Sequence, residues 1–238
     1  MARAALWAIS VIAAILPSMS AGQGLPRFGA ELKISTLGAG IDVATAVTRR
    51  SNLRAGFNAF NYSTSFSKDG IGYDGELSLR SVEVLYDQYL FGGVHLSPGL
   101  MAYDGNRGSG AALATGGRLF SLGGTTYLSS PANPVNGTGV LDTRKVSPMV
   151  LLGVGNLLPR NNRQFTANFE AGVVFQGTPK ATLHLSGSAC NPQGTVCQNV
   201  SATPAIEADV QAEQTKINNS VNWFHFYPVV SIGFGYKF

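Results

Sequence analysis

Apolar and polar residues alternate along most of the chain from about residue 27 onward, and turn-forming residues separate the alternating runs. The clearest run is 165–176, in which phenylalanine, alanine and valine occupy every second position from Phe165 to Phe175. The positions between them include Thr166, Asn168 and Glu170. Successive side chains of a β-strand point to opposite faces, so this run predicts a strand with one apolar and one polar face. Such ten-residue segments are typical of transmembrane β-barrels.

The same pattern predicts an all-β fold, an antiparallel transmembrane β-barrel of about eight strands; ten strands also fit the pattern. The candidate strands are 27–35, 37–48, 53–67, 76–90, 92–104, 145–157, 164–185 and 223–238. Short connections at 49–52, 90–92 and 160–163 alternate with longer ones at 68–75, 105–144 and 186–222. This asymmetry is expected of an outer-membrane barrel, whose outer loops are the longer ones.

Two of these runs change the parity of their apolar residues, one near Phe60 and the other near Arg80. An extra residue in one strand produces such a change, so we expect β-bulges at both places. Gly123 and Gly124 separate two short runs and predict a hairpin within the long 105–144 connection.

Composition supports membrane insertion by strands. Only 13% of the residues are charged, against about 25% in soluble domains, so part of the surface is expected to avoid water. Residues 1–21 have the positive start, short apolar run and small residues of a secretory signal peptide, with cleavage expected after Ser20 or Ala21. The barrel domain then spans 22–238. No later run reaches the 18 consecutive apolar residues of a membrane-spanning helix.

The connection 186–222 is predicted to carry a disulfide and one short helix. Cys190 and Cys197 enclose a turn-rich spacer in a chain expected to be exported, which favours a local disulfide. Two thiols without paired histidines make a poor zinc site, so we expect no metal. Thr203 is a candidate N-cap and Pro204 suits the first helical position. We expect this helix to pack on the barrel mouth, and a partner-binding helix is the alternative.

Ionisable side chains on the inward face of the predicted strands are expected to form a polar network in the lumen, because a charge facing lipid costs several kcal/mol. Glu83, Arg80 and Lys237 are expected to join or adjoin this network. Two interpretations stay open: a mutually neutralising network that fills a narrow lumen, and a polar pathway for small solutes or ions. The residues expected in the lumen network are Glu31, Lys33, Asp42, Arg54, Glu170 and His225.

Other chemistries find little support in the sequence. There is no dense basic stripe for nucleic acid, no cofactor motif, and none of the common hydrolase, nucleotide or zinc-protease motifs. His95 and Ser97 form a His-x-Ser pair similar to that of outer-membrane lipid A deacylases. Alternation turns both residues inward, however, and the neighbouring strand offers no Glu to complete a triad. We therefore expect no enzyme.

The last eight residues, SIGFGYKF, resemble the signal that the barrel-assembly machinery recognises in outer-membrane proteins. The residues that carry this resemblance are Ser231, Gly233, Tyr236 and Phe238. More broadly, the segments STLGAGIDVA, SNLRAGFNAFNY, GNLLPR, FQGTPKATLHLSG and FYPVVSIGFGYKF together resemble a group of uncharacterised bacterial outer-membrane barrels, loosely similar to OmpA-like and opacity-protein-like barrels.

The resemblance implies location in the bacterial outer membrane, with membrane lipid and the barrel-assembly machinery as partners and no established activity. The expected function is a non-enzymatic structural or surface-interaction role with an unknown surface partner. The alternatives are a porin-like small-solute or ion pore, a lipid A-modifying hydrolase on His95 and Ser97, and a soluble secreted β-sandwich.

Overall fold

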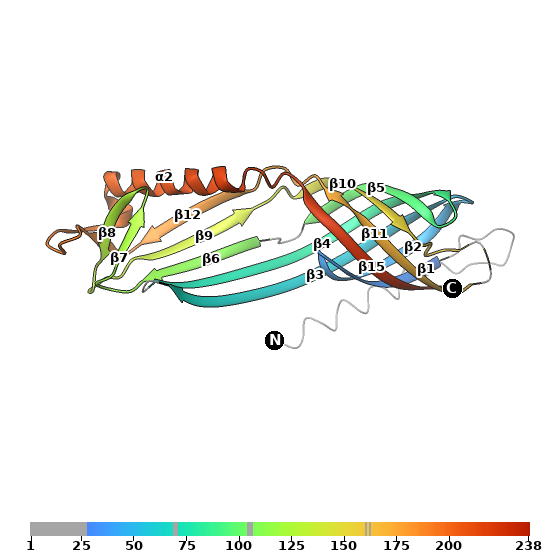
Figure 1. Ribbon diagram of the computed structural model, residues 1–238, viewed down its shortest axis with the longest axis horizontal. Helices are drawn as coiled ribbons and strands as arrows, with labels where there is room; N and C mark the ends of the chain where they lie inside the picture. Colours follow the sequence, from blue (N-terminus) through green and yellow to red (C-terminus); the bar gives the residue numbers. More distant parts are fainter. Residues whose placement is uncertain (1–27, 69–70, 104–106, 160, 162) are drawn as a thin grey trace.

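In the computed structural model, eight antiparallel strands close into a ring, from which a long sheet extends at one end (Figure 1). The described residues are 28–68, 71–103, 107–159, 161 and 163–238, so the expected signal peptide at 1–21 lies outside them. The ring strands are β1 (Phe28–Ser35), β2 (Gly38–Thr48), β3 (Ser51–Lys68), β4 (Ile71–Phe91), β5 (Val94–Tyr103), β10 (Val146–Val154), β11 (Phe165–Val174) and β15 (Tyr227–Lys237).

The ring closes because its first and last strands pair. β15 pairs with β1 from Gly29↔Lys237 to Ser35↔Ser231 and with β11 on its other side. β5 likewise pairs with both β4 and β10. The predicted all-β antiparallel barrel of about eight strands is confirmed, and each predicted strand overlaps one ring strand. The predicted strand 164–185 is too long, because Gly177 takes a positive φ and separates β11 from a further strand.

We call the two ends of the ring the turn end and the extension end. The turn end carries the turns at 49–50 and 92–93, the described residues of the 155–164 loop (155–159, 161, 163 and 164), and residues Phe28 and Phe238. At the extension end, β3 and β4 continue together beyond the ring and are joined by β6 (Arg107–Ala114), β9 (Asn136–Asp142) and β12 (Lys180–Ser186). We call these five strands, with the elements packed on them, the extension.

Two predicted outer loops are therefore folded sheet. Residues 71–75 belong to β4, whose pairing with β3 continues to Lys68↔Ile71, and the 105–144 connection supplies β6 and β9. The predicted hairpin around Gly123 is present as β7 (Leu119–Leu122) and β8 (Thr125–Ser129). It forms a second, small sheet with β13 (Ser188–Cys190) and β14 (Cys197–Asn199). The disulfide between Cys190 and Cys197 joins these last two strands.

The predicted β-bulges near Phe60 and Arg80 are wrong. β3 and β4 stay in one register from Ser51↔Gln88 to Lys68↔Ile71, so no extra residue is inserted there. Register shifts occur instead near the turn end, at Ala46/Thr48 and Tyr89/Phe91. Something other than strand geometry must change the parity of the apolar residues.

The parity changes because the polarity of the two faces is exchanged. Within the ring, β3 points Arg54 and Asn58 inward and Phe57 outward. Beyond Ala59 the same inward parity carries Phe60, Tyr62 and Phe66, and the outward parity carries only asparagine and serine. β4 shows the same exchange between Leu79 and Ser81. The surroundings of the sheet therefore change at this level.

Helix α2 (Pro204–Val221) lies along β12 in the extension (Figure 1). Gln214 accepts a hydrogen bond from the Leu183 amide at 3.1 Å, and Asn218 accepts one from the Ala181 amide at 2.7 Å. Thr203 precedes the helix as expected, but its hydroxyl donates back to the Asn199 carbonyl and does not cap it. No helix among the described residues is long and apolar enough to cross a membrane.

Candidate functional site

The interior of the ring holds a cluster of buried polar side chains that we call the lumen cluster. Each member belongs to a ring strand, points inward by alternation, and is at most 6% exposed. The lumen cluster consists of Glu31, Lys33, Asp42, Arg54, Asn58, Glu83, Asp87, His95, Ser97, Asn168 and Glu170. Five of the six residues predicted for the lumen network are among them, and the structure brings these five together.

Arg54 is the centre of the cluster. Its guanidinium contacts Asp42 at 3.2 Å and Asp87 at 3.0 Å, and it donates two hydrogen bonds to Glu170. Lys33 forms a second centre, with its ammonium between Asp42 and Glu83. Asp42 thereby joins both cations. Because a buried ion pair offsets its desolvation cost only when the geometry is complete, these contacts hold β1 to β4 and β11 in one arrangement.

His95 and Ser97, the pair considered from the sequence, each bond to a buried carboxylate. His95 Nε2 lies 2.9 Å from Glu170 Oε1, while the Ser97 hydroxyl donates to Asp87 at 2.7 Å. Glu170 was missed as a partner because only the adjoining strand was considered, whereas β11 and β5 flank β10 and the two side chains meet over Gly153 of that strand. Both side chains are at most 2% exposed.

Inward glycines give the long polar side chains their room. A Cβ added to Gly153 would lie 2.5 Å from His95 Nε2, and one added to Gly56 would lie 2.2 Å from an Asp42 carboxylate oxygen. A Cβ on Gly233 would similarly meet Glu31, whose carboxylate accepts a hydrogen bond from Asn168. Small and large residues thus alternate around the lumen, as expected when eight strands leave space only for side chains.

The cluster holds more carboxyl groups than cations. Five carboxylates are buried among the described ring residues, namely Glu31, Asp42, Glu83, Asp87 and Glu170. The cations beside them are Lys33, Arg54 and, if protonated, His95. The cluster therefore disfavours anions inside the lumen, and each cation in it matters for stability.

Asp87, His95 and Glu170 place one ligand atom each within 4.8 Å of one another, a spacing that could hold a metal ion. Arg54 already contacts both carboxylates of this group. A guanidinium occupies the place where a second cation would bind, so we assign no metal to the group.

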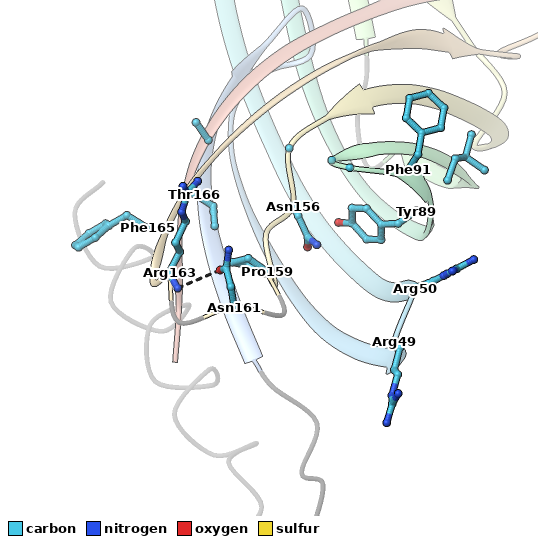
Figure 2. A pocket seen from close by; sticks show the side chains of 15 residues that line it. Arg49, Arg50, Tyr89, Phe91, Asn156, Pro159, Asn161, Arg163, Phe165 and Thr166 are labelled. Carbon is cyan, nitrogen blue, oxygen red and sulfur yellow. Dashed lines mark hydrogen bonds between the residues drawn. The ribbon is translucent and has the colours of Figure 1, made fainter.

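The turn end has a concave surface of about 900 Å³ (Figure 2). Among the described residues that line it are Arg49, Arg50 and Arg163, and no carboxylate. Figure 2 shows Arg49 and Arg50 on one side and Arg163 on the other. This surface favours anionic groups. Leu157 and Leu158 of the 155–164 loop are at most 1% exposed and pack against Ala44 inside the ring.

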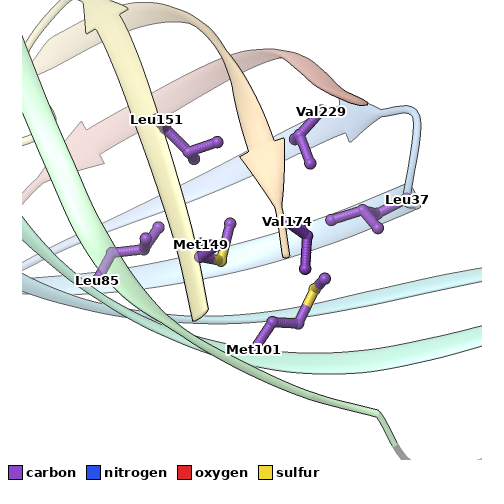
Figure 3. Packing of buried hydrophobic residues seen from close by; sticks show 7 residues of the cluster. All are labelled: Leu37, Leu85, Met101, Met149, Leu151, Val174 and Val229. Carbon is purple, nitrogen blue, oxygen red and sulfur yellow. The ribbon is translucent and has the colours of Figure 1, made fainter. Parts of the chain in front are cut away.

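An apolar layer closes the other half of the lumen (Figure 3). Its members come from the β1–β2 turn and from strands β4, β5, β10, β11 and β15, and none is more than 3% exposed. They are Leu37, Leu85, Met101, Met149, Leu151, Val174 and Val229. Close-packed apolar side chains of this kind disfavour water. Among the described residues, apolar groups therefore lie on both sides of the lumen cluster.

Three residues expected in or beside the lumen cluster lie elsewhere. His225 is exposed and bonds to Thr178, because β15 begins only at Tyr227 and alternation does not govern the residue. Arg80 is exposed on the outward parity of β4, where the predicted bulge is missing. Lys237 is buried but donates to the carbonyls of Pro159 and Asn161 at the turn end.

The outer surface of the ring is apolar on all eight strands. Large apolar side chains there are strongly exposed, Leu32 at 68%, Ile34 at 70% and Phe234 at 67%. Between the level of Arg80 and the turn end, no Lys, Arg, Asp or Glu of the described ring residues points outward. We call this surface the belt. It includes Leu32, Ile34, Ile41, Val43, Leu53, Phe57, Val82, Val84, Leu96, Leu100, Val146, Leu152, Phe165, Phe169, Val230, Ile232 and Phe234.

Comparison with known proteins supports the fold and does not show a family. No protein-family model and no curated protein matches the sequence. The crystal structure of Acinetobacter baumannii CarO is similar, with a TM-score of 0.56 and 22% identity, over 92% of this chain and 100% of that chain. Acinetobacter baumannii CarO2 is also similar, with a TM-score of 0.55 and 18% identity, over 91% of this chain and 100% of that chain. At these identities the likeness shows the fold alone.

Proposed function

We propose that this chain is an integral protein of the bacterial outer membrane with a non-enzymatic role, in which a closed barrel anchors the extension at the cell surface for structural or interaction purposes. The signal peptide expected at 1–21 and the resemblance of the C-terminal segment to an assembly signal support the location. The closed lumen supports a role as an anchor.

One observation carries the membrane proposal: the faces of β3 and β4 exchange polarity while their register continues. A barrel in lipid has apolar groups outside and polar groups inside. A sheet in water has polar groups outside and apolar groups toward its packed side. The exchange between Ala59 and Phe60 therefore fits a boundary at which lipid ends and water begins. A soluble β-sandwich gives no reason for it.

Tryptophan fluorescence tests this boundary. Phe57 and Ser63 share the outward parity of β3 and lie six residues apart, which is about 20 Å along a strand. In a Trp223→Phe background reconstituted with brominated lipids, Phe57→Trp is expected to be strongly quenched and Ser63→Trp only weakly. The matched control is quenching of the same two variants by acrylamide in the water, which is expected to quench Ser63→Trp more strongly than Phe57→Trp. Equal quenching by the lipid at both sites would contradict membrane insertion at this level.

A small-solute or ion pore is the alternative function. The charged residues of the lumen cluster favour it, and the apolar layer of Figure 3 opposes it. The non-enzymatic assignment is likewise supported by the partners of His95 and Ser97, which bond to Glu170 and Asp87 and are at most 2% exposed. Unchanged lipid A composition on overexpression, and after His95→Ala, is the expected result.

Insertion by the barrel-assembly machinery through Ser231, Gly233, Tyr236 and Phe238 stays a prediction. In the structure the rings of Tyr236 and Phe238 meet edge to face at the turn end, with 5.2 Å between their centroids. Phe238→Ser is expected to lower the amount of heat-modifiable barrel in the membrane fraction. The control Phe169→Ser, in the belt but outside this segment, separates loss of recognition from loss of lipid contact.

A further inference from the structure

We propose that the edge of β3 from Phe60 to Ser67 is a docking site for an extended polypeptide segment, which adds to the extension as a further strand. The inference rests on the proposed function, since it requires that the extension lies outside the membrane. It deepens that function by naming the class of partner.

The edge is open among the described residues. Pairing of β3 with β2 ends at Ala39↔Ala59, whereas pairing with β4 continues to Lys68↔Ile71. From Phe60 onward, β3 therefore has a strand on only one side. In an antiparallel ladder alternate residues direct both backbone groups to the same side, so these eight residues present about four N–H and four C=O groups to a partner. Such a row is a template for another strand.

The opposite edge of the same sheet is protected. β12 has β9 on one side, and on the other side α2 supplies Gln214 and Asn218, whose side chains bond the amides of Leu183 and Ala181. The fold thus satisfies one edge with helix side chains, and among the described residues nothing equivalent lies along Phe60 to Ser67. The difference between the two edges of one sheet argues that the β3 edge is kept available.

The side chains define the chemistry of the partner. Phe60, Tyr62 and Phe66 are 42%, 56% and 56% exposed on the face that also carries α2. Phe66 is held by stacking on Tyr73, with 5.1 Å between ring centroids. The intervening residues are asparagine and serine, and no residue from 60 to 67 is charged. Charged edge residues, the usual protection against pairing, are missing there. The fitting partner is an uncharged segment with apolar side chains at alternate positions.

A second copy of this chain fits poorly. Two copies in one membrane both run β3 away from the turn end, so their edges could meet only as parallel strands. A two-fold axis along the membrane normal would also turn one sheet over, placing the apolar face of one copy beside the polar face of the other. An extended segment of another protein is free of this constraint and can enter in the antiparallel direction, which is slightly more stable.

A synthetic peptide with the sequence of residues 60–67, FNYSTSFS, is a suitable probe. Paired antiparallel about Ser63, it places Phe60 opposite Phe66 and Tyr62 opposite Thr64 on one face. Aromatic pairs and aromatic–β-branched pairs across strands are favourable, and no like charges meet. A free peptide is not subject to the orientation that the membrane imposes on a second copy.

Binding of the fluorescent peptide to the purified full-length barrel is measured by anisotropy with two N-methylated versions of the peptide. One carries N-methyl groups on the even residues and the other on the odd residues, so only one of them blocks the amides that face β3. We expect the unmodified peptide and one version to bind, and the other to bind at least about tenfold more weakly, since several hydrogen bonds to the β3 backbone are lost. Phe66→Ser in the protein is expected to weaken binding several-fold, and Ser63→Ala on the opposite face to leave it unchanged.

Equal binding of both N-methylated peptides would mean adsorption to the apolar face and would overturn strand addition, as would no binding of the unmodified peptide. Heat-modifiable migration and brominated-lipid quenching of the same preparation test the barrel separately. If the protein is folded and inserted in the membrane but does not bind the peptide, the docking proposal is wrong and the proposed function is unaffected.

Discussion

Arg54→Met is the most informative perturbation of the lumen cluster, because it removes one cation and leaves three buried carboxylates without it. In the native protein the guanidinium contacts Asp42, Asp87 and Glu170 and is 2% exposed. Methionine keeps much of the volume and leaves the charge imbalance. Removing one partner of a buried ion pair typically costs about 3–5 kcal/mol, so the free energy of unfolding is expected to fall by at least that range.

The decrease is measured by urea unfolding in micelles, with the heat-modifiable gel band and β-sheet circular dichroism as coincident probes. With a slope of about 2 kcal/mol per molar urea, a loss of about 3–5 kcal/mol lowers the midpoint by about 1.5–2.5 M. Arg118→Met, at an exposed arginine of the extension, is the matched control and is expected to change the free energy by less than about 0.5 kcal/mol.

A second substitution is expected to change stability in opposite directions in the two backgrounds. Glu170→Gln alone is expected to destabilise the protein, since Arg54 loses its bidentate partner. In the Arg54→Met background the same change should stabilise it, because one of the carboxylates left without the guanidinium becomes neutral. A midpoint shift below about 0.5 M for Arg54→Met, or the same sign for Glu170→Gln in both backgrounds, would refute the view that the cluster is a set of interdependent buried charges.

Three further results are expected. Gly153→Ala should lower the free energy of unfolding by about 1–3 kcal/mol, because the added Cβ would lie 2.5 Å from His95 Nε2. The control is Gly110→Ala, whose Cβ would meet no atom closer than 3.8 Å, and equal losses of stability for the two variants would contradict the packing argument. Gln214→Ala should accelerate hydrogen exchange of the Leu183 amide by about fivefold, the equivalent of a hydrogen bond of roughly 1 kcal/mol, without affecting the ring. Unchanged exchange would show that the side chain does not protect the edge. The folded wild-type protein should give no conductance steps in planar bilayers, because the apolar layer of Figure 3 fills the lumen; steps from well-folded protein would favour the pore.

The exchange of polarity at Ala59 explains why local rules misjudge the middle of the molecule. From the sequence, the change of parity near Phe60 and Arg80 reads as a bulge, because an alternating pattern normally keeps its polar and apolar faces. The continuous pairing of β3 with β4 shows that the register of the strands does not change there, and we attribute the exchange to the proposed boundary between lipid and water. A single strand pattern cannot tell an inserted residue from a change of solvent, since both move the apolar residues to the other parity.

The sequence by itself determined the class of fold and most ring strands, because a strand that separates lipid from a packed interior must alternate at every position. For the same reason it placed Glu31, Lys33, Asp42, Arg54 and Glu170 on the inward faces. Alternation is read from neighbouring residues alone, and it is enough to tell the inward face from the outward face wherever the two sides of a strand differ in polarity. It fails at His225, which precedes the strand.

Only the tertiary structure decided which inward residues meet. The contact of Arg54 with Glu170 joins residues far apart in the sequence across the lumen, and that of His95 with Glu170 joins them over Gly153 of β10. They depend on the order in which the ring closes and on the tilt of its strands. The same holds for the apolar layer that closes the lumen, and for the extension, in which segments expected to be loops become strands because β3 and β4 continue beyond the ring and offer β6 an edge.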